Sequence, residues 1–319
     1  MTMLALPRCT FGAITAVAIL AGCNGAAVQS ASPGLTAAYT KAQRKTSSGM
    51  LLYVSRPTEN AVSFYAYSPG SIGREEGTIG SGLDEPQGLC SDKHGNVWVA
   101  NTNGEQVLEY AHGRTVVKKT LTTPKLYPAG CAVSPTGDLA VSSICSYSSC
   151  RGAGNVLIFH NATGNPQYYT CSSLYDYYFL AYDNQGDLYV DGLTSISNSR
   201  FAFCELPSGS GTMSPVSLNV APLFPGSVQT QGKYVWIGDQ DHRGHFVYKY
   251  KIAGSSATKV ARIDLEKSRY GVGQFTIDGN YLIGPQAKGD AAVWNFPAGG
   301  NPVDRKKITG EPLGSAISK

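Results

Sequence analysis

The feature that most constrains the fold of this chain is a turn that recurs five times. Each copy has the form x-Gly-polar and directly precedes a short apolar strand, and successive turn glycines are 42, 49, 46 and 47 residues apart. The turn glycines are Gly95, Gly137, Gly186, Gly232 and Gly279. A glycine between two strand-like segments is typical of a β-hairpin, because tight hairpin turns need positive φ angles. The chain is therefore a series of repeated strand units.

Each repeat predicts four antiparallel strands. In the repeat of Gly95, a small-residue strand at 88–92 precedes the turn, and an apolar strand at 97–100 follows it. A third strand at 107–110 and a more polar fourth strand at 115–121 complete the unit. Four strands at a period of about 40 to 50 residues describe one blade of a β-propeller. A β-sandwich also has many short strands, but it has no reason to repeat one four-strand order five times.

The number of inner strands predicts the number of blades. Six segments qualify: 88–92, 130–134, 179–183, 226–230, 273–277 and 314–318. The last segment has no blade after it, whereas 50–80 supplies outer strands that have no inner strand before them. We therefore predict an all-β, six-bladed β-propeller whose ring is closed when the C-terminal strand joins the N-terminal blade. Such closure pairs two edges that would otherwise be exposed.

The N-terminus predicts export and a lipid anchor. An apolar run at 10–21 has the length of a signal-peptide core and is too short to span a bilayer. It ends in Leu20-Ala21-Gly22-Cys23, which resembles the lipobox of bacterial lipoproteins. The resemblance implies cleavage after residue 22 and attachment of lipid, palmitate included, to Cys23, so that the membrane is a partner. An ordinary secretory signal that contains a cysteine is the alternative.

The same resemblance predicts the domain organisation and the compartment. Residues 1–22 are a lipoprotein signal peptide, 23–48 a lipidated flexible tether rich in Ala, Ser, Thr and Gly, and 49–319 the propeller. The expected location is the bacterial cell envelope. Because Asn24 rather than an aspartate follows the lipid-bearing cysteine, the resemblance implies the outer membrane if the bacterium is Gram-negative.

The repeat itself resembles a known group of propellers over almost the whole mature chain. Its signature is Pro-x-Gly-apolar-x-(Ser/Asp), then the turn glycine and an apolar strand, as in the segment 86–100. This signature is similar to that of the NHL-repeat and gluconolactonase-like six-bladed propellers. The resemblance implies the architecture, but one fold hosts many activities.

Six of the eight cysteines are expected to form disulfides. Removing Cys9 with the signal and Cys23 as the lipid anchor leaves an even number, which suggests disulfides in an exported protein. Sequence alone allows 15 connectivities for six cysteines. No Cys-x-x-Cys occurs, so the cysteines do not suggest a zinc site. The pairings that we favour, in order, are Cys145–Cys150, Cys90–Cys131 and Cys171–Cys204.

The sequence gives weak support to catalysis. Lactonase-like propellers hold a divalent cation with a ring of Glu, Asn and Asp oxygens. Here Glu85 and Glu311 precede inner strands, but no inner-strand asparagine joins them, and Asp92 and Asp183 fall at the other strand ends. We therefore expect no catalytic residue, metal or cofactor, and a protein that binds a ligand. A lactonase- or lyase-type enzyme and a structural envelope scaffold remain the alternatives.

The most suggestive binding feature is the run Tyr175-Asp176-Tyr177-Tyr178, in the loop that leads into an inner strand. This loop and the loop that holds Cys145 and Cys150 are expected on the same axial face. Tyrosines beside a carboxylate can stack on sugars or hold peptides. The alternative is that they pack between blades. We expect Tyr175 to be exposed and Tyr178 to be partly buried.

A second candidate cluster comprises Asp241, His242 and His245 in an outer loop, which is either a solvated loop or an acid–base site. The partner expected from these features is a small molecule, a glycan or a protein. The formal net charge of +4 over 319 residues is too dilute for a nucleic-acid footprint.

Overall fold

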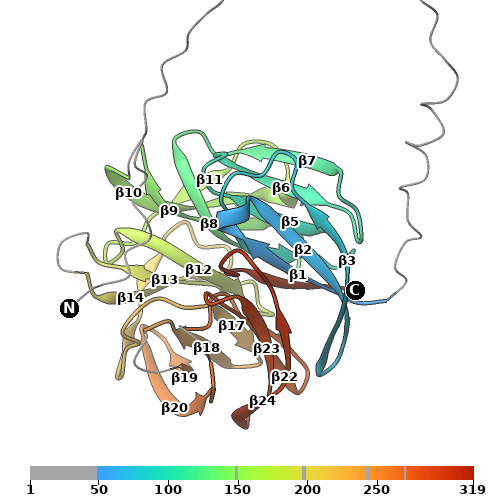
Figure 1. Ribbon diagram of the computed structural model, residues 1–319. Coiled ribbons are helices and arrows are strands. Elements are labelled where there is room, and N and C mark those ends of the chain that lie inside the picture. Colours follow the sequence, from blue (N-terminus) through green and yellow to red (C-terminus); the bar gives the residue numbers. More distant parts are fainter. Residues whose placement is uncertain (1–48, 148–149, 196–198, 242–244, 269–270) are drawn as a thin grey trace, which may run out of the picture. The chain divides into compact units, whose positions relative to one another are not determined.

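The structure is a computed structural model that describes residues 49–147, 150–195, 199–241, 245–268 and 271–319 (Figure 1). The chain divides into two units, Met1–Lys45 and Thr46–Lys319, and all described residues belong to the second. The predicted signal peptide, Cys23 and the tether therefore lie outside the described residues. In the described part, no helix is long and apolar enough to cross a bilayer. Its helices are two 3₁₀ turns, η2 (Pro57–Glu59) and η3 (His160–Ala162).

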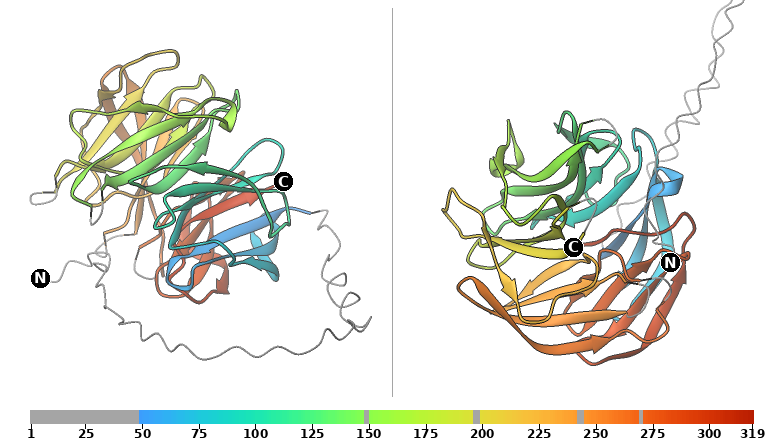
Figure 2. Two further views of the ribbon diagram at one scale, coloured as in Figure 1. Left: turned by 90° about the horizontal axis from the view of Figure 1, so that it is seen from above. Right: turned by 90° about the vertical axis from the view of Figure 1, so that its left-hand side faces the viewer.

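The strands form six sheets, each of which is one blade of a β-propeller (Figures 1 and 2). From the inner to the outer strand, blade 1 contains β25 (Ser315–Ser318), β1 (Leu51–Arg56), β2 (Ala61–Ser68) and β3 (Ser71–Ile79). Blade 2 contains β4 (Pro86–Ser91), β5 (Val97–Asn101), β6 (Gln106–Tyr110) and β7 (Val117–Thr122). Blade 3 contains β8 (Leu126–Val133), β9 (Leu139–Ser146), β10 (Gly152–Phe159) and β11 (Gln167–Tyr169).

The remaining three blades follow the same order. Blade 4 contains β12 (Asp176–Tyr182), β13 (Leu188–Leu193), β14 (Phe201–Leu206) and β15 (Ser214–Pro215). Blade 5 contains β17 (Val228–Gln231), β18 (Tyr234–Asp239), β19 (Phe246–Ala253) and β20 (Ser256–Asp264), and β16 (Ser217–Leu218) adds a fifth, parallel strand beside β20. Blade 6 contains β21 (Thr276–Asp278), β22 (Tyr281–Gln286), β23 (Asp290–Asn295) and β24 (Gly299–Lys307). The prediction of an all-β, six-bladed propeller is confirmed.

The ring closes as the sequence predicts. Strand β25 pairs with β1 in antiparallel register, with Leu51 opposite Ser318 and Val54 opposite Ser315. The side chain of Ile317 is buried between blades, so the last strand contributes to the core as well as to the sheet. The C-terminal strand thus completes blade 1, and the edge of β1 is paired.

In blades 2 and 4 the repeated turn is held by the aspartate that directly follows the inner strand. In blade 2 the Oδ1 atom of Asp92 accepts hydrogen bonds from the backbone N–H groups of His94 (2.8 Å) and Asn96 (2.9 Å). Asp183 holds the corresponding turn of blade 4 in the same way. Gly95 has φ +78°, a conformation that glycine adopts without strain. The two aspartates at these strand ends therefore have a structural role.

Glycines let the inner strands approach one another closely around the axis. A Cβ atom added to Gly314 would lie 2.2 Å from the carbonyl oxygen of Gln87 in the next blade. One added to Gly88 would lie 2.4 Å from the carbonyl oxygen of Ala129. No real Cβ contact is that short, so the backbone spacing near the axis requires glycine at these two positions.

A hydrogen bond between a side chain and the backbone bridges each of the six blade junctions near the axis. Five of them are donated by a hydroxyl to a carbonyl oxygen, and in the sixth a carboxylate oxygen accepts from a backbone N–H. They join Ser55 to Gln87, Thr102 to Pro128, Ser142 to Tyr178, Asp191 to Gly226, Ser227 to Phe275 and Ser315 to Gln274. These bonds satisfy backbone groups on the free edges of the inner strands.

Three disulfides add covalent links, with the pairings that the sequence analysis favoured. Cys90 and Cys131 join the inner strands of blades 2 and 3, with their Cα atoms 5.6 Å apart. Cys171 joins the connection before blade 4 to Cys204 of that blade's third strand. Cys145 and Cys150 close a short loop at the end of β9.

Candidate functional site

The propeller has two faces that differ in their connections. The inner strands begin on one face, which also carries the connections between second and third strands; we call it the loop face. They end on the opposite face, at the repeated glycine turns; we call it the turn face. The run from Tyr175 to Tyr178, the loop from Cys145 to Cys150 and the residues Asp241 and His245 all belong to the loop face.

Tyr175 connects three segments of the loop face. Its backbone N–H donates to the carbonyl oxygen of Leu193 at 2.7 Å, and its own carbonyl accepts from Gly154 at 2.8 Å. Its hydroxyl donates to the carbonyl oxygen of Arg151 at 3.3 Å. The Tyr175 side chain is half-buried, rather than fully exposed as expected from the sequence. It lies beside the loop that Cys145 and Cys150 close.

Tyr177 corrects the expectation that the whole run faces a ligand. Its side chain is 1% exposed and belongs to the core between blades 3 and 4. Its hydroxyl accepts a hydrogen bond from the backbone N–H of Cys171 at 2.7 Å. The side chain is therefore a packing element, which is the alternative that the sequence left open.

Tyr178 and Asp176 are partly buried on the loop face. The ring of Tyr178 meets that of Phe224, which lies in the connection before blade 5, in a T-shaped arrangement with centroids 5.6 Å apart. Burial raises the pKa of Tyr178, and the carboxylates of Asp176 and Asp191 raise it further. Burial also raises the pKa of Asp176 to about 6. Tyr178 is thus partly buried, as expected.

Two exposed apolar side chains that the sequence analysis missed flank this run. Tyr147 is 58% exposed and Leu223 is 59% exposed. The ring of Tyr147 lies against Gly152, where an added Cβ would approach it to 2.9 Å. Leu223 is placed by its backbone N–H, which donates to the carboxylate of Asp239 at 2.9 Å. We name the set the tyrosine patch: Tyr147, Tyr175, Tyr178, Leu223 and Phe224.

The position of Tyr147 could have been inferred from the sequence, because it lies inside a short loop between two cysteines that were already expected to pair. Leu223 offers no such signal. It lies in an irregular connection, and its exposure depends on the hydrogen bonds that Asp239 makes across the blade.

The second candidate cluster is only partly described. His242 lies outside the described residues. The Nδ1 atom of His245 accepts a hydrogen bond from the backbone N–H of Gly271 at 3.2 Å, and burial lowers the pKa of His245. The backbone N–H of Asp241 donates to Asp239 at 3.1 Å. These contacts tie the outer loop of blade 5 to the connection before blade 6.

The lactonase-type ring of metal ligands has no counterpart in the part of the chain that the structure describes, where no group of three His, Cys, Asp or Glu side chains could hold a metal ion. Glu85, which precedes an inner strand, accepts a hydrogen bond from the Nδ2 atom of Asn103 at 2.8 Å. Its carboxylate is therefore used in a hydrogen bond between two connections of blade 2.

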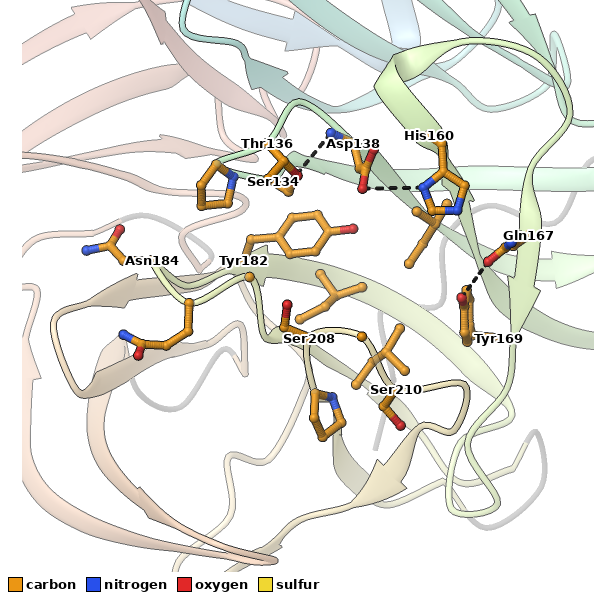
Figure 3. Close-up of a pocket in the computed structure, with 18 residues that line it drawn as sticks. Ser134, Thr136, Asp138, His160, Gln167, Tyr169, Tyr182, Asn184, Ser208 and Ser210 are labelled. Carbon is orange, nitrogen blue, oxygen red and sulfur yellow. Dashed lines mark hydrogen bonds and ion pairs between the residues drawn. The ribbon is translucent and has the colours of Figure 1, made fainter.

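A cavity of about 410 Å³ opens on the turn face, between blades 3 and 4 (Figure 3). Tyr182 extends its ring into this cavity, and Asp138 and His160 lie on one wall with Oδ2 and Nδ1 3.4 Å apart. None of these three residues was a sequence-predicted site residue. The repeat did not reveal them, because Asp138 falls in a turn whose length and polarity resemble those of the other blades and Tyr182 is the last residue of a regular inner strand.

Comparison with known proteins identifies the fold alone. No protein-family model matches the chain, and no curated protein matches it. Among solved structures, a chain of a nidogen/laminin complex is similar with a TM-score of 0.66 at 12% identity, covering 85% of this chain and 99% of that chain. A protein of unknown function from Bacteroides caccae is similar with a TM-score of 0.62 at 13% identity, covering 85% and 100%. At these identities the shared property is the propeller architecture.

Proposed function

We propose that this chain is an exported, lipid-anchored β-propeller of the bacterial cell envelope, of the NHL-like kind, which binds a protein partner through the tyrosine patch and does not act as an enzyme. The observation that carries the proposal is the exposure of Tyr147 and Leu223 on either side of the half-buried Tyr175, Tyr178 and Phe224. Single exposed apolar residues are common, but several apolar side chains gathered on one face are typical of an interaction surface.

The composition of the patch favours a protein partner. Tyrosine is enriched in the buried centre of protein interfaces, because it combines a large apolar area with few rotatable bonds. The patch is also held in shape before binding. The Cys145–Cys150 disulfide restrains the loop of Tyr147, and three hydrogen bonds fix Tyr175. A pre-organised surface loses less conformational entropy when a partner binds.

The position of the patch suits an anchored protein. Strand β1 begins at Leu51 on the turn face, so the chain enters the propeller at the face opposite the patch. The junction with the proposed tether is therefore not on the loop face that carries the patch. The similar propeller of known structure occurs in a nidogen/laminin complex, which is an assembly of proteins.

Export and anchoring rest on different observations. Three disulfides support an oxidising compartment, because such bonds persist outside the cytoplasm. The lipid anchor rests on the lipobox-like sequence that ends at Cys23. We expect Cys23→Ala to abolish incorporation of an alkyne-labelled palmitate supplied to the growing cells. Undiminished labelling of the variant would refute the anchor and leave the partner proposal intact.

The binding proposal can be tested in the envelope by photo-crosslinking. The amino acid p-benzoylphenylalanine is placed at Tyr147 on the patch, and at the exposed Val116 on the turn face as a matched control. We expect a discrete crosslinked species from position 147 and none of the same mass from position 116. The species should disappear when Tyr175→Ala and Leu223→Ser are combined with the probe. Crosslinks that are equal at both positions, or absent from position 147, contradict the proposal.

A further inference from the structure

The cavity on the turn face lies on the side of the propeller opposite the tyrosine patch, and the proposed function does not use it. Its floor is apolar and consists of the buried side chains Ile158, Leu188 and Leu206 at the junction of blades 3 and 4. Its walls are two turns, one at 134–138 and one at 184–186, and the loop 207–210 (Figure 3). A volume of about 410 Å³ is in the range of small-molecule sites.

The position of the cavity has a structural cause in the repeat. Trp98 in blade 2 and Tyr189 in blade 4 both lie three residues after their turn glycine, and each fills the junction with the following blade. The equivalent residue of blade 3 is Ala140. The outer strands beside this junction are also short: β11 has three residues and β15 has two, whereas β20 and β24 have nine. This junction therefore has a smaller residue at that position than blades 2 and 4 have, and shorter outer strands than blades 5 and 6 have.

Polar groups surround the apolar floor. The Tyr182 hydroxyl points into the cavity and has no hydrogen-bond partner among the described residues (Figure 3). Burial raises the pKa of Tyr182, so this hydroxyl stays protonated and able to donate. On the far wall, the hydroxyl of Tyr169 donates to Oε1 of Gln167 at 2.7 Å, which leaves the amide Nε2 of Gln167 as a donor. Asp138 accepts from the backbone N–H of Asn161 at 2.8 Å.

The charges around the cavity argue against an ionic ligand. No lysine or arginine lines it, so nothing but His160 offers a positive charge to an anion. The one carboxylate, Asp138, lies 3.4 Å from His160, so it is not an isolated charge that awaits a cation. Besides the Asp138–His160 pair, what remains is a set of uncharged donors and acceptors around an apolar floor with two tyrosine rings at its edge.

We propose that this cavity binds a short neutral saccharide through the Tyr182 hydroxyl and the Asp138–His160 pair, with the Tyr182 and Tyr169 rings against the sugar's carbon-bound hydrogens. A neutral sugar offers hydroxyl groups that both donate and accept, together with apolar C–H faces, and this matches the mixed lining. Aromatic rings supply contact area, and the polar tip of each tyrosine supplies orientation.

The test uses the exported full-length chain carrying Cys23→Ala, with maltose, cellobiose, lactose and N,N′-diacetylchitobiose as probes. Digalacturonate serves as an anionic probe of similar size. Saturation-transfer NMR detects binding, and calorimetry gives the dissociation constant. We expect transfer to at least one neutral disaccharide, a loss of at least tenfold in affinity for Ser208→Trp at the cavity mouth, and at least fivefold for Tyr182→Phe. The control Ser255→Trp, at an exposed turn of blade 5, should bind as the parent does.

Each outcome decides the proposal. Transfer that is lost in Ser208→Trp and kept in Ser255→Trp supports it. Absence of transfer from all four neutral probes, transfer that survives Ser208→Trp, or binding of digalacturonate alone overturns it. None of these results bears on the tyrosine patch, because Ser208 and Tyr182 lie on the turn face, away from the patch.

Discussion

The amide of Gln274 provides a sensitive test of how the ring is closed. Gln274 lies just before the inner strand of blade 6, yet its side chain bonds to Leu89 in the inner strand of blade 2, across blade 1. Its Oε1 accepts from the backbone N–H of Leu89, and its Nε2 donates to the carbonyl oxygen of the same residue, both at 2.7 Å. Gly314 permits this crossing, because a Cβ there would lie 3.1 Å from Oε1.

The loss of stability expected when Gln274 is replaced follows from the backbone groups of Leu89 that the substitution leaves unpaired. Gln274→Met keeps the length of the side chain and removes both hydrogen bonds, in a site where Gln274 is 6% exposed. A buried donor or acceptor without a partner costs about 1–3 kcal/mol, so the two groups of Leu89 together cost about 2–6 kcal/mol. At about 2–4 °C per kcal/mol for a domain of this size, we expect the melting temperature to fall by roughly 4–24 °C.

The assay is a thermal melt of oxidised protein, with Gln185→Met as the matched control on an exposed turn. The control should melt within about 1 °C of the parent, since surface substitutions change stability by about 0.5 kcal/mol or less. Gln274→Glu adds a second measurement. Its protonated carboxyl restores a donor for the Leu89 carbonyl, whereas its ionised form places a buried charge there. The melting temperature of Gln274→Glu should therefore lie closer to that of the parent at pH 5 than at pH 8. A Gln274→Met variant that melts with the control would refute the reasoning.

Three further expectations follow. Deletion of 312–319 removes β25 and exposes the edge of β1, so it should cost several of the about 5–15 kcal/mol that stabilise a domain, and an unchanged urea midpoint would contradict closure by this strand. Burial raises the pKa of Asp176 to about 6, so the folded state loses stability as pH rises through that value. Asp176→Asn should therefore be more stable than the parent by about 1 kcal/mol at pH 8, after allowance for solvent screening, and equal to it at pH 4 in matched melts. Tyr177→Ala should cost about 3–5 kcal/mol, whereas the half-buried Tyr175→Ala should cost less than half as much; equal costs would show that Tyr175 belongs to the core.

Most of the fold could be predicted from the repeat, because the repeat combines two independent signals. A turn glycine fixes where a hairpin reverses, and a constant strand order fixes how the strands are grouped. The unpaired segments at the two ends then left one economical closure, and β25 beside β1 is that closure. The Cys90–Cys131 pairing followed from the same grouping, because the two cysteines fall on adjacent inner strands of the predicted ring, whereas Cys145–Cys150 was favoured because its loop is short.

The contacts that cross the ring could not be predicted in this way. Gln274 and Leu89 are separated by 185 residues, and their bond depends on the absence of a side chain at Gly314 in the intervening blade. Nothing in the local sequence of Gln274 distinguishes it from an exposed glutamine. Such contacts depend on the curvature of the closed ring, which the strand order alone does not determine.

The orientation of the tyrosines at the candidate site could not be predicted from the sequence either. Simple alternation along a strand would place Tyr175 and Tyr177 on one side. The structure separates them, because Tyr175 precedes β12 and lies outside the regular alternation of that strand. The result is one tyrosine in the core and one at the surface.

Both proposed sites occur where the repeat is interrupted. The tyrosine patch lies at connections that have no counterpart of the same length in every blade, and the cavity lies at the junction where Ala140 stands at the position that Trp98 has in blade 2. A regular junction is closed by packing and has no surface left to specify a ligand. An irregular one loses packing energy, and that loss is tolerated in a ring whose remaining junctions, hydrogen bonds and disulfides hold the blades in place. In this propeller the residues that break the repeat are therefore the best candidates for function.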